Sequence, residues 1–142
     1  VDQSIRQPRI RRAGRAPGAP NVVITPVQCE SPRAEVPRLS GTRVARVANG
    51  TLVERLCGSG ELRAEYFCSF ETNPAFIGPW QRAGLVIAAT GEAGEMRAFE
   101  LPERAFFVAT LFQPQLSSSF VAPHPLVVGF FLACARGPLQ EF

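Results

Sequence analysis

The chain has no lysine, a single histidine and no apolar run long enough to cross a membrane. All fifteen basic residues are Arg, which is typical of a GC-rich coding sequence and gives no indication of function. With His124 as the only histidine, a histidine-based metal site is not expected. The longest apolar run, residues 126–135, is interrupted by Gly129 and is shorter than the roughly 18–20 residues that span a bilayer. We therefore expect no metal, no cofactor and no membrane span.

The cysteines match neither zinc-site nor redox-motif spacing; they are Cys29, Cys57, Cys68 and Cys134. An even number permits two disulfides. However, 142 residues with 46% apolar content are typical of one modest core and not of a small secreted scaffold. We expect four unpaired thiols.

Positive charge is concentrated at the start of the chain. Residues 1–20 contain one acid and five arginines: Arg6, Arg9, Arg11, Arg12 and Arg15. Residues 21–142 carry ten Arg and eleven Glu, so the body is close to neutral. Because residues 1–20 also hold three Pro, two Gly and little apolar surface, they cannot fold alone.

We expect these residues to form an extended tail, ordered by contact with another molecule and packed little against residues 21–142. Its arginines would bind neighbouring protein subunits, RNA or anionic lipid. A solvated tail without a partner is the alternative. An Arg-rich start at Val1 also resembles the edge of an organellar transit peptide, which favours the mitochondrial matrix or another organelle, with the cytoplasm as the alternative.

Residues 21–137 have the pattern of one folded domain, followed by a short tail at 138–142. Predicted strands cover 22–27, 42–47, 51–54, 63–70, 85–89, 96–101 and 106–112. Asn49-Gly50 and the turn at 91–94 predict two hairpins. A helix is expected over 126–135 and is stopped by Gly137 and Pro138. Its apolar residues surround most of the axis, which predicts packing on more than one side.

The sequence ELPERAFFVAT at 100–110 and PHPL at 123–126, followed by an apolar helix, resemble the end of a known domain. They are similar to the C-terminal end of the class I glutamine amidotransferase domain of CTP synthase. The resemblance runs from about residue 22 to residue 136 and is strongest over 95–135. It implies an α/β fold: an incomplete glutaminase-like domain with mixed, mostly antiparallel strands and a C-terminal closing helix.

In that family the last strand ends in His-Pro-Glu, whose His and Glu activate a cysteine nucleophile. Here the same place holds Gln113-Pro114-Gln115. An amide is neither a general base nor an anion, so the activating pair is absent. The Phe-Gln-Pro sequence resembles a degenerate bacterial group related to the CTP synthase C-terminal region. The resemblance therefore implies a pseudoenzyme without catalytic residues.

Further upstream, residues 65–74 occupy the place of the stretch that helps bind glutamine in CTP synthase. Glu71 and Asn73 match that stretch, whereas Ser69 and Phe70 replace its Arg-Tyr pair. The family's Gly-x-Cys-x-Gly nucleophile turn, which belongs to the first half of the domain, has no counterpart among these residues. Cys57-Gly58-Ser59-Gly60 is not that turn, because residue 55 is Arg and the segment lies in a predicted hairpin.

Other groupings are weaker. Gln113 and Gln115 can position a ligand by hydrogen bonding, but we favour a retained turn without function. Cys29 or Cys68 with His124 would make a cysteine–histidine pair, against which we set buried thiols and a histidine at a helix start. Glu65 and Glu71 would lie about 20 Å apart on an extended segment, too far to act as a pair. Six phenylalanines are core candidates: Phe106, Phe107, Phe112, Phe120, Phe130 and Phe131.

The leading interpretation is a non-catalytic accessory subunit of a larger protein complex, built on a degenerate glutaminase-like scaffold. A half domain would leave a strand edge and an apolar face that a partner subunit covers. One alternative is half of a split glutamine amidotransferase, or a ligand-binding pseudoenzyme. Another is an RNA-binding, ribosome-associated protein that uses the Arg-rich tail.

Overall fold

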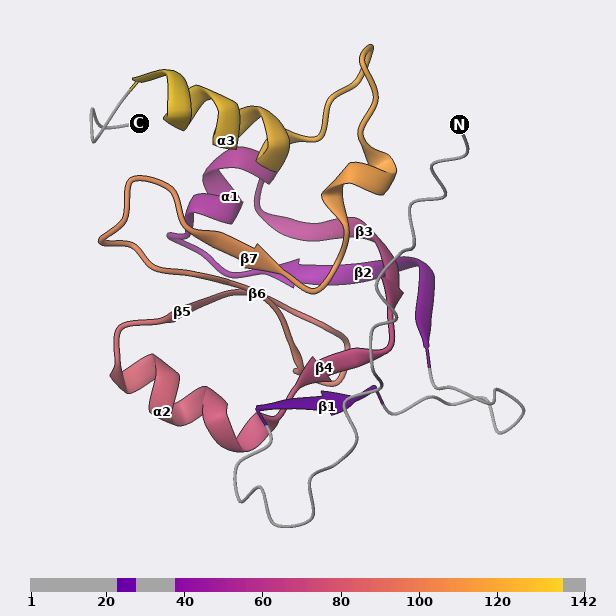
Figure 1. The fold of residues 1–142 in the computed structure, drawn as a ribbon, viewed down its shortest axis with the longest axis vertical. Coiled ribbons are helices and arrows are strands. Elements are labelled where there is room, and N and C mark those ends of the chain that lie inside the picture. The colour runs from indigo at the N-terminus through magenta and orange to yellow at the C-terminus, as the bar shows by residue number, and fades with distance from the viewer. Residues whose placement is uncertain (1–22, 28–37, 137–142) are drawn as a thin grey trace, which may run out of the picture.

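The computed structural model describes residues 23–27 and 38–136, which contain seven strands, three α-helices and two short 3-10 helices (Figure 1). The predicted tails at 1–20 and 138–142 and all five candidate partner-binding arginines lie outside the described residues. Cys29 lies outside them as well. The described residues belong to the domain that was predicted to start near residue 21.

The main sheet has five strands in the order β3-β2-β5-β6-β7. Their bounds are Leu39–Val47 for β2, Gly60–Cys68 for β3, Val86–Thr90 for β5, Met96–Glu100 for β6 and Val108–Thr110 for β7. A separate pair joins β1, Ile24–Pro26, to β4, Phe70–Thr72. Every strand pair in the described part of the chain is antiparallel, which confirms the predicted fold class.

The turn between β5 and β6 forms where Gly91 and Gly94 predicted it. Gly91 donates its backbone N–H to the Glu95 carbonyl at 2.8 Å, and Gly94 adopts a φ of 83°, which favours glycine. The prediction at 22–27 was only partly right, because β1 is a short, largely exposed edge strand and not a buried one. Pro26 is tolerated there since an edge strand needs fewer backbone donors.

The hairpin predicted around Asn49-Gly50 is wrong, because residues 51–54 begin a helix and not a strand. α1 spans Leu52–Cys57, and the Thr51 side chain caps it by accepting the Glu54 N–H at 3.1 Å. The Glu54 carboxylate in turn accepts the N–H of Gly50 at 2.6 Å, one residue before the N–H that a capping box binds. The partner of β2 is therefore β3, which begins after α1.

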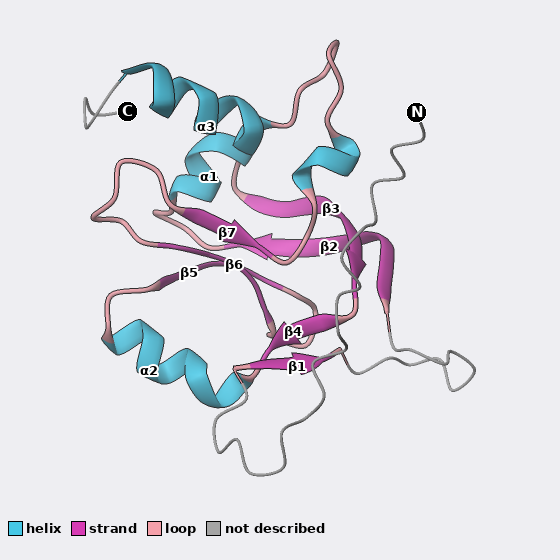
Figure 2. Cartoon of the chain, viewed as in Figure 1, coloured by secondary structure: helices cyan, strands magenta, loops and turns pink. Residues whose placement is uncertain are grey.

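The three α-helices lie on two sides of the main sheet (Figure 2). α2, Ile77–Arg82, was not predicted; its Trp80 ring lies 6.3 Å from the Phe99 ring of β6. α1 and α3, Pro125–Arg136, lie together on the other side. A Cβ added to Gly129 of α3 would come within 2.7 Å of a Leu56 methyl group, so glycine permits this close helix contact.

α3 forms as predicted but is packed on one side only. Leu126 and Gly129 are buried, whereas Phe131 is 65% exposed on the outer side. The expected packing on more than one side of the helix is not seen among the described residues, and most of the six core assignments to phenylalanine were wrong. Phe112 is buried and Phe106 is half-buried, but the other four are exposed: Phe107, Phe120, Phe130 and Phe131.

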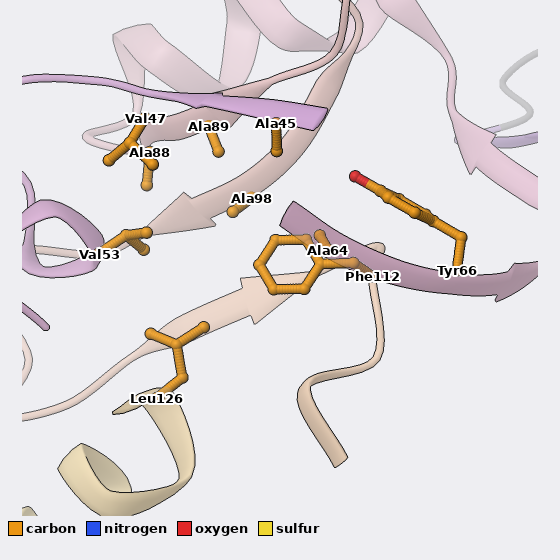
Figure 3. Close-up of a cluster of buried hydrophobic side chains, with 10 residues drawn as sticks. All are labelled: Ala45, Val47, Val53, Ala64, Tyr66, Ala88, Ala89, Ala98, Phe112 and Leu126. Carbon is orange, nitrogen blue, oxygen red and sulfur yellow. The ribbon is translucent and has the colours of Figure 1, made fainter. Parts of the chain in front are cut away.

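The core lies between the sheet and the helices α1 and α3 (Figure 3). Small residues from the central strands allow the layers to approach closely, and Phe112 and Tyr66 fill the larger space with their rings 6.1 Å apart. The cluster comprises Ala45, Val47, Val53, Ala64, Tyr66, Ala88, Ala89, Ala98, Phe112 and Leu126. Phe112 precedes Gln113 directly, so the core fixes the position of the candidate turn.

Candidate functional site

The candidate site is the turn that follows β7, where the resemblance to a glutaminase domain predicts that Gln113 stands in place of a histidine. Leu111 donates its N–H to the Arg97 carbonyl at 2.8 Å, which keeps the segment on β6. Two residues later the chain reaches β3, because the Gln113 N–H donates to the Glu65 carbonyl at 2.8 Å. The sheet is therefore curled, because residues 111–113 contact both β6, near one edge of the sheet, and β3, at the other edge.

The Gln113 side chain completes this attachment. Its Oε1 atom accepts the backbone N–H of Phe67 at 2.6 Å, so the amide oxygen is bound to β3. Gln115, on the 3-10 helix η2 that spans Pro114–Ser117, is exposed. The two glutamines therefore have separate environments, and the one that occupies the histidine position has a structural hydrogen bond.

A second group of polar residues surrounds Arg97 of β6, which is almost fully buried. Its guanidinium forms ion pairs with Glu95 and, at 3.9 Å, with Glu71. The same group lies 5.5 Å from the centre of the Tyr66 ring. A Cβ on Gly91 would lie 2.9 Å from Arg97 Nε, which is too close, so a larger residue at position 91 would clash with the guanidinium. Sequence reasoning identified Glu71 but not Arg97, which links Glu71 to β6.

Electrostatics at this cluster follow from burial and from the Arg97 charge. Burial acts to raise the pKa of the Glu95 carboxyl, but hydrogen bonds and Arg97 outweigh it, so that pKa lies below its ordinary value. Burial also raises the pKa of the Tyr66 hydroxyl, which Arg97 opposes. The Tyr66 hydroxyl oxygen is buried and has no hydrogen-bond partner among the described residues, which is costly in a folded protein.

His124 is a structural residue at the start of α3. Its Nδ1 atom accepts the Leu126 N–H at 3.2 Å, and its own N–H donates to the Ser118 hydroxyl at 2.9 Å. The ring lies 6.5 Å from that of Phe112, and burial lowers the pKa of His124. This agrees with the interpretation of His124 as a helix-start residue.

The cysteines and the remaining acids do not form an alternative centre in the described part of the chain. Cys68 donates its thiol to the Phe70 carbonyl at 3.0 Å, whereas the His124 Nδ1 atom accepts a backbone N–H, so the two have different partners. Cys57 ends α1, and burial raises its pKa to about 11, which keeps it a protonated thiol at neutral pH. Cys57, Cys68 and Cys134 are all free.

Glu65 accepts a hydrogen bond from the Thr42 hydroxyl, while Glu71 pairs with Arg97, so these acids are not brought together. Within residues 23–27 and 38–136, no group of three or more His, Cys, Asp or Glu is arranged to hold a metal ion. No helix in the same ranges is long and apolar enough to cross a membrane.

One buried carboxylate outside the turn was missed. Glu100, at the end of β6, accepts the Leu52 N–H at 2.9 Å with each of its oxygens and the Val53 N–H at 3.3 Å. A negative charge at the first turn of α1 satisfies donors that the helix itself leaves unpaired. The capping-box spacing of Thr51 and Glu54 was a sequence signal for this helix, but nothing in the sequence pointed to Glu100.

Comparison with known proteins agrees with this architecture. The chain is 30% identical to the CTP synthase of Caldivirga maquilingensis over 115 residues, or 80% of this chain and 21% of that protein. It is 31% identical to the CTP synthase of Sulfurisphaera tokodaii over 122 residues, or 84% and 23%. The chain thus spans about a fifth of the length of these curated relatives. No family model matches it.

Among solved structures, the glutaminase domain of Trypanosoma brucei CTPS with bound acivicin superposes with a TM-score of 0.76. The match covers 88% of this chain and 50% of the solved one at 20% sequence identity, so it shows the fold. The order of the strands, the C-terminal helix α3 and the similarity to CTP synthases all agree on the family to which this chain is related. These residues form a class I glutamine amidotransferase-like segment that is related to CTP synthase.

Proposed function

We propose that this chain is a non-catalytic, structural part of a larger assembly, built on a glutaminase-like scaffold. The observation that carries the proposal is the hydrogen bond from the Phe67 N–H to Gln113 Oε1. A residue that must accept a proton from a nucleophile needs a basic atom directed at it. Gln113 has no basic atom, and its oxygen is bound to the backbone of β3.

Gln115 supports the same conclusion, because a neutral, exposed amide supplies no charge to orient a base. Burial raises the pKa of the Cys57 thiol to about 11, which disfavours the thiolate form that a cysteine nucleophile needs. The remaining role is mechanical: a curled antiparallel sheet that presents its surfaces to other subunits.

Glutamine hydrolysis by the purified chain tests this proposal. We expect no ammonia release above a blank without protein, with the full-length Aeropyrum pernix CTP synthase as the positive control. Changing Gln113→His together with Gln115→Glu should not give turnover in a protein of these 142 residues, which contain no Gly-x-Cys-x-Gly nucleophile turn. Turnover that a single Cys57→Ser or Cys68→Ser substitution abolishes would contradict the proposal.

A second candidate is a pseudoenzyme that binds a small polar ligand, for which L-glutamine is the probe. The buried, unpartnered Tyr66 hydroxyl beside Arg97 favours it, because a ligand would satisfy that group. Glu71, which matches the family's glutamine-binding stretch, belongs to the same cluster.

A ligand that binds only the folded state raises the unfolding midpoint, and the stabilisation grows with the logarithm of the ligand concentration once this exceeds the dissociation constant. We expect L-glutamine to raise the midpoint of the wild-type chain and to have less effect on Tyr66→Phe, with D-glutamine as a matched control. An equal effect of glutamine on both proteins would exclude a role for the Tyr66 hydroxyl. The RNA-binding alternative depends on the tail, which lies outside the described residues, and stays a prediction.

A further inference from the structure

Asn49 and Gly50 form an exposed turn between β2 and α1. The residues on either side of this turn are fixed by hydrogen bonds. Ala48 donates its N–H to the Ala88 carbonyl of β5 at 3.0 Å, and the buried Thr51 donates its hydroxyl to the Ala48 carbonyl at 2.8 Å. The turn is therefore held at both ends, while the two residues at its tip are open to water.

The backbone nitrogen of Gly50 is bound to a carboxylate. Its N–H donates to Glu54 Oε2 at 2.6 Å, whereas an ordinary N–H···O bond is about 2.9 Å long, and short bonds are typical of a charged acceptor. Gly50 has a φ of 77°, and no heavy atom outside the adjacent residues lies within 4 Å of the place that a Cβ would take. The nitrogen is therefore accessible as well as bound.

This nitrogen is next in the chain to the side-chain amide of Asn49. A main-chain nitrogen that attacks the side-chain carbon Cγ of the preceding residue closes a five-membered ring, and glycine hinders the attack least because it has no Cβ. The attack needs a base for the N–H proton, and the Glu54 carboxylate already binds that proton. We propose that Asn49 is a site of self-catalysed deamidation, with Glu54 as the general base.

The reaction consumes only water. The bond between Gly50 N and Asn49 Cγ forms while the N–H proton moves to the Glu54 carboxylate. The bond between Cγ and Nδ2 then breaks, and Nδ2 leaves as ammonia with the proton that Glu54 returns. Water adds to either carbonyl of the resulting succinimide and opens it to aspartate or isoaspartate. Arg55, whose Nη1 atom lies 3.5 Å from Gly50 O, places positive charge at the turn where the attacked amide oxygen becomes negative.

The isoaspartate product changes the backbone that leads into α1. Its main chain passes through the former side-chain carbon, which adds a methylene group between the fixed residues Ala48 and Thr51. Thr51 caps α1, and the Leu52 N–H is bound by Glu100, so the first turn of the helix must absorb the added length. Conversion to isoaspartate therefore loosens α1. This modification is independent of the proposed function.

Asn73 is an internal control. It is followed by Pro74, whose nitrogen carries no N–H that could be removed. The Asn73 Oδ1 atom accepts the Ala75 N–H at 3.0 Å, so this side chain caps a short helix. Asn49, in contrast, precedes an N–H that a carboxylate binds. Deamidation is therefore expected at Asn49 and not at Asn73.

Peptide mapping of the purified full chain, incubated at neutral pH, tests the inference. Trypsin cuts after Arg46 and Arg55 and releases residues 47–55, in which Asn49 is the only asparagine. Mass spectrometry follows the replacement of its amide by a carboxyl group, and an isoaspartyl methyltransferase detects the isoaspartate. We expect both products at Asn49 and an unchanged Asn73. An Asn49 that stays intact would overturn the inference.

Two comparisons separate the action of Glu54 from the ordinary lability of an Asn-Gly sequence. A synthetic peptide of residues 47–55 lacks the fold and should convert more slowly than the chain. Glu54→Gln keeps an oxygen that accepts the Gly50 N–H but supplies no base. General bases contribute about 10²–10⁴-fold in enzymes, so this variant should convert at least about tenfold more slowly. Glu92→Gln, which changes an exposed carboxylate elsewhere, is the matched control and should convert at the wild-type rate.

The pH profile shows whether Glu54→Gln loses a base or only a contact. Without the carboxylate, hydroxide must remove the proton, so the rate of this variant should rise in proportion to the hydroxide concentration. The wild-type rate should rise less steeply. Conversion of Glu54→Gln at or above the wild-type rate would overturn the inference. If circular dichroism shows that this variant does not fold, the synthetic peptide decides, and a peptide that converts as fast as the chain overturns it.

The assay of glutamine hydrolysis judges the proposed function separately. Ammonia from Asn49 needs no added glutamine and is limited to one molecule per chain, whereas turnover depends on glutamine and continues. An aged chain that contains isoaspartate should also unfold at a lower temperature than fresh protein, and Asn49→Gln should show no such change with age. An aged chain as stable as the fresh one would contradict the expected loosening of α1.

Discussion

Residues 38–104 and residues 105–135 belong to one fold but differ in their content of charged residues and in how many large apolar side chains they expose. The first part is rich in charge and uses it internally: Glu100 caps α1, and Arg97 joins Glu71 and Glu95. The second part has no charge, and it supplies both the buried Phe112 and the exposed Phe131. The first part thus uses its charges to hold its own elements together, whereas the second combines a buried apolar side with an exposed apolar side.

The largest expected change in stability comes from comparing a buried and an exposed phenylalanine within residues 105–135. Phe112→Ala should lower the free energy of unfolding by about 3–5 kcal/mol, because it leaves a cavity between Tyr66 and Leu126. Phe131→Ala should change it by no more than about 0.5 kcal/mol, as for other surface substitutions. Urea denaturation of both variants measures the difference. Equal losses would show that Phe131 is part of the core of the isolated chain.

The next effect tests the first part. Glu100→Ala should cost about 2–3 kcal/mol, because the buried N–H groups of Leu52 and Val53 lose a charged acceptor. Glu100→Gln is the matched variant: it keeps one acceptor oxygen and should cost less. Chemical denaturation compares them with wild type. A stability of Glu100→Ala within error of wild type would show that α1 does not depend on this cap.

The smallest effect is the pH dependence at His124, which stands where α3 meets the core. Burial holds its folded-state pKa below the ordinary value of 6.5. As pH falls from 7 to 5, the unfolded chain gains a proton before the folded chain does, so stability declines over that range. His124→Asn keeps a cap acceptor but does not titrate, and it should show a shallower decline. Slopes that are equal for the two proteins would contradict this assignment.

The elements that were predicted correctly from the sequence are those with strong turn or helix-end residues beside them. The β5–β6 hairpin follows from Gly91 and Gly94 between two apolar segments, and the start and end of α3 agree with proline and glycine positions. Gln113 and Gln115 were identified from the resemblance alone, and the structure shows where each lies. α1 was mistaken for a strand because Thr-Leu-Val after Asn-Gly has the local pattern of a hairpin.

Residues close together in the chain were enough to specify the antiparallel order of β5 and β6, the closing helix and the chemical neutrality of the turn after β7. Tertiary structure added to residues 52–57 what their own sequence did not show, since the carboxylate that accepts the first N–H groups of this helix comes from Glu100, 48 positions beyond Leu52. Long-range packing also selects which apolar residues are buried. A phenylalanine at 112 and one at 131 have the same side chain, and only the arrangement of distant strands and helices around them makes one a core residue and leaves the other exposed.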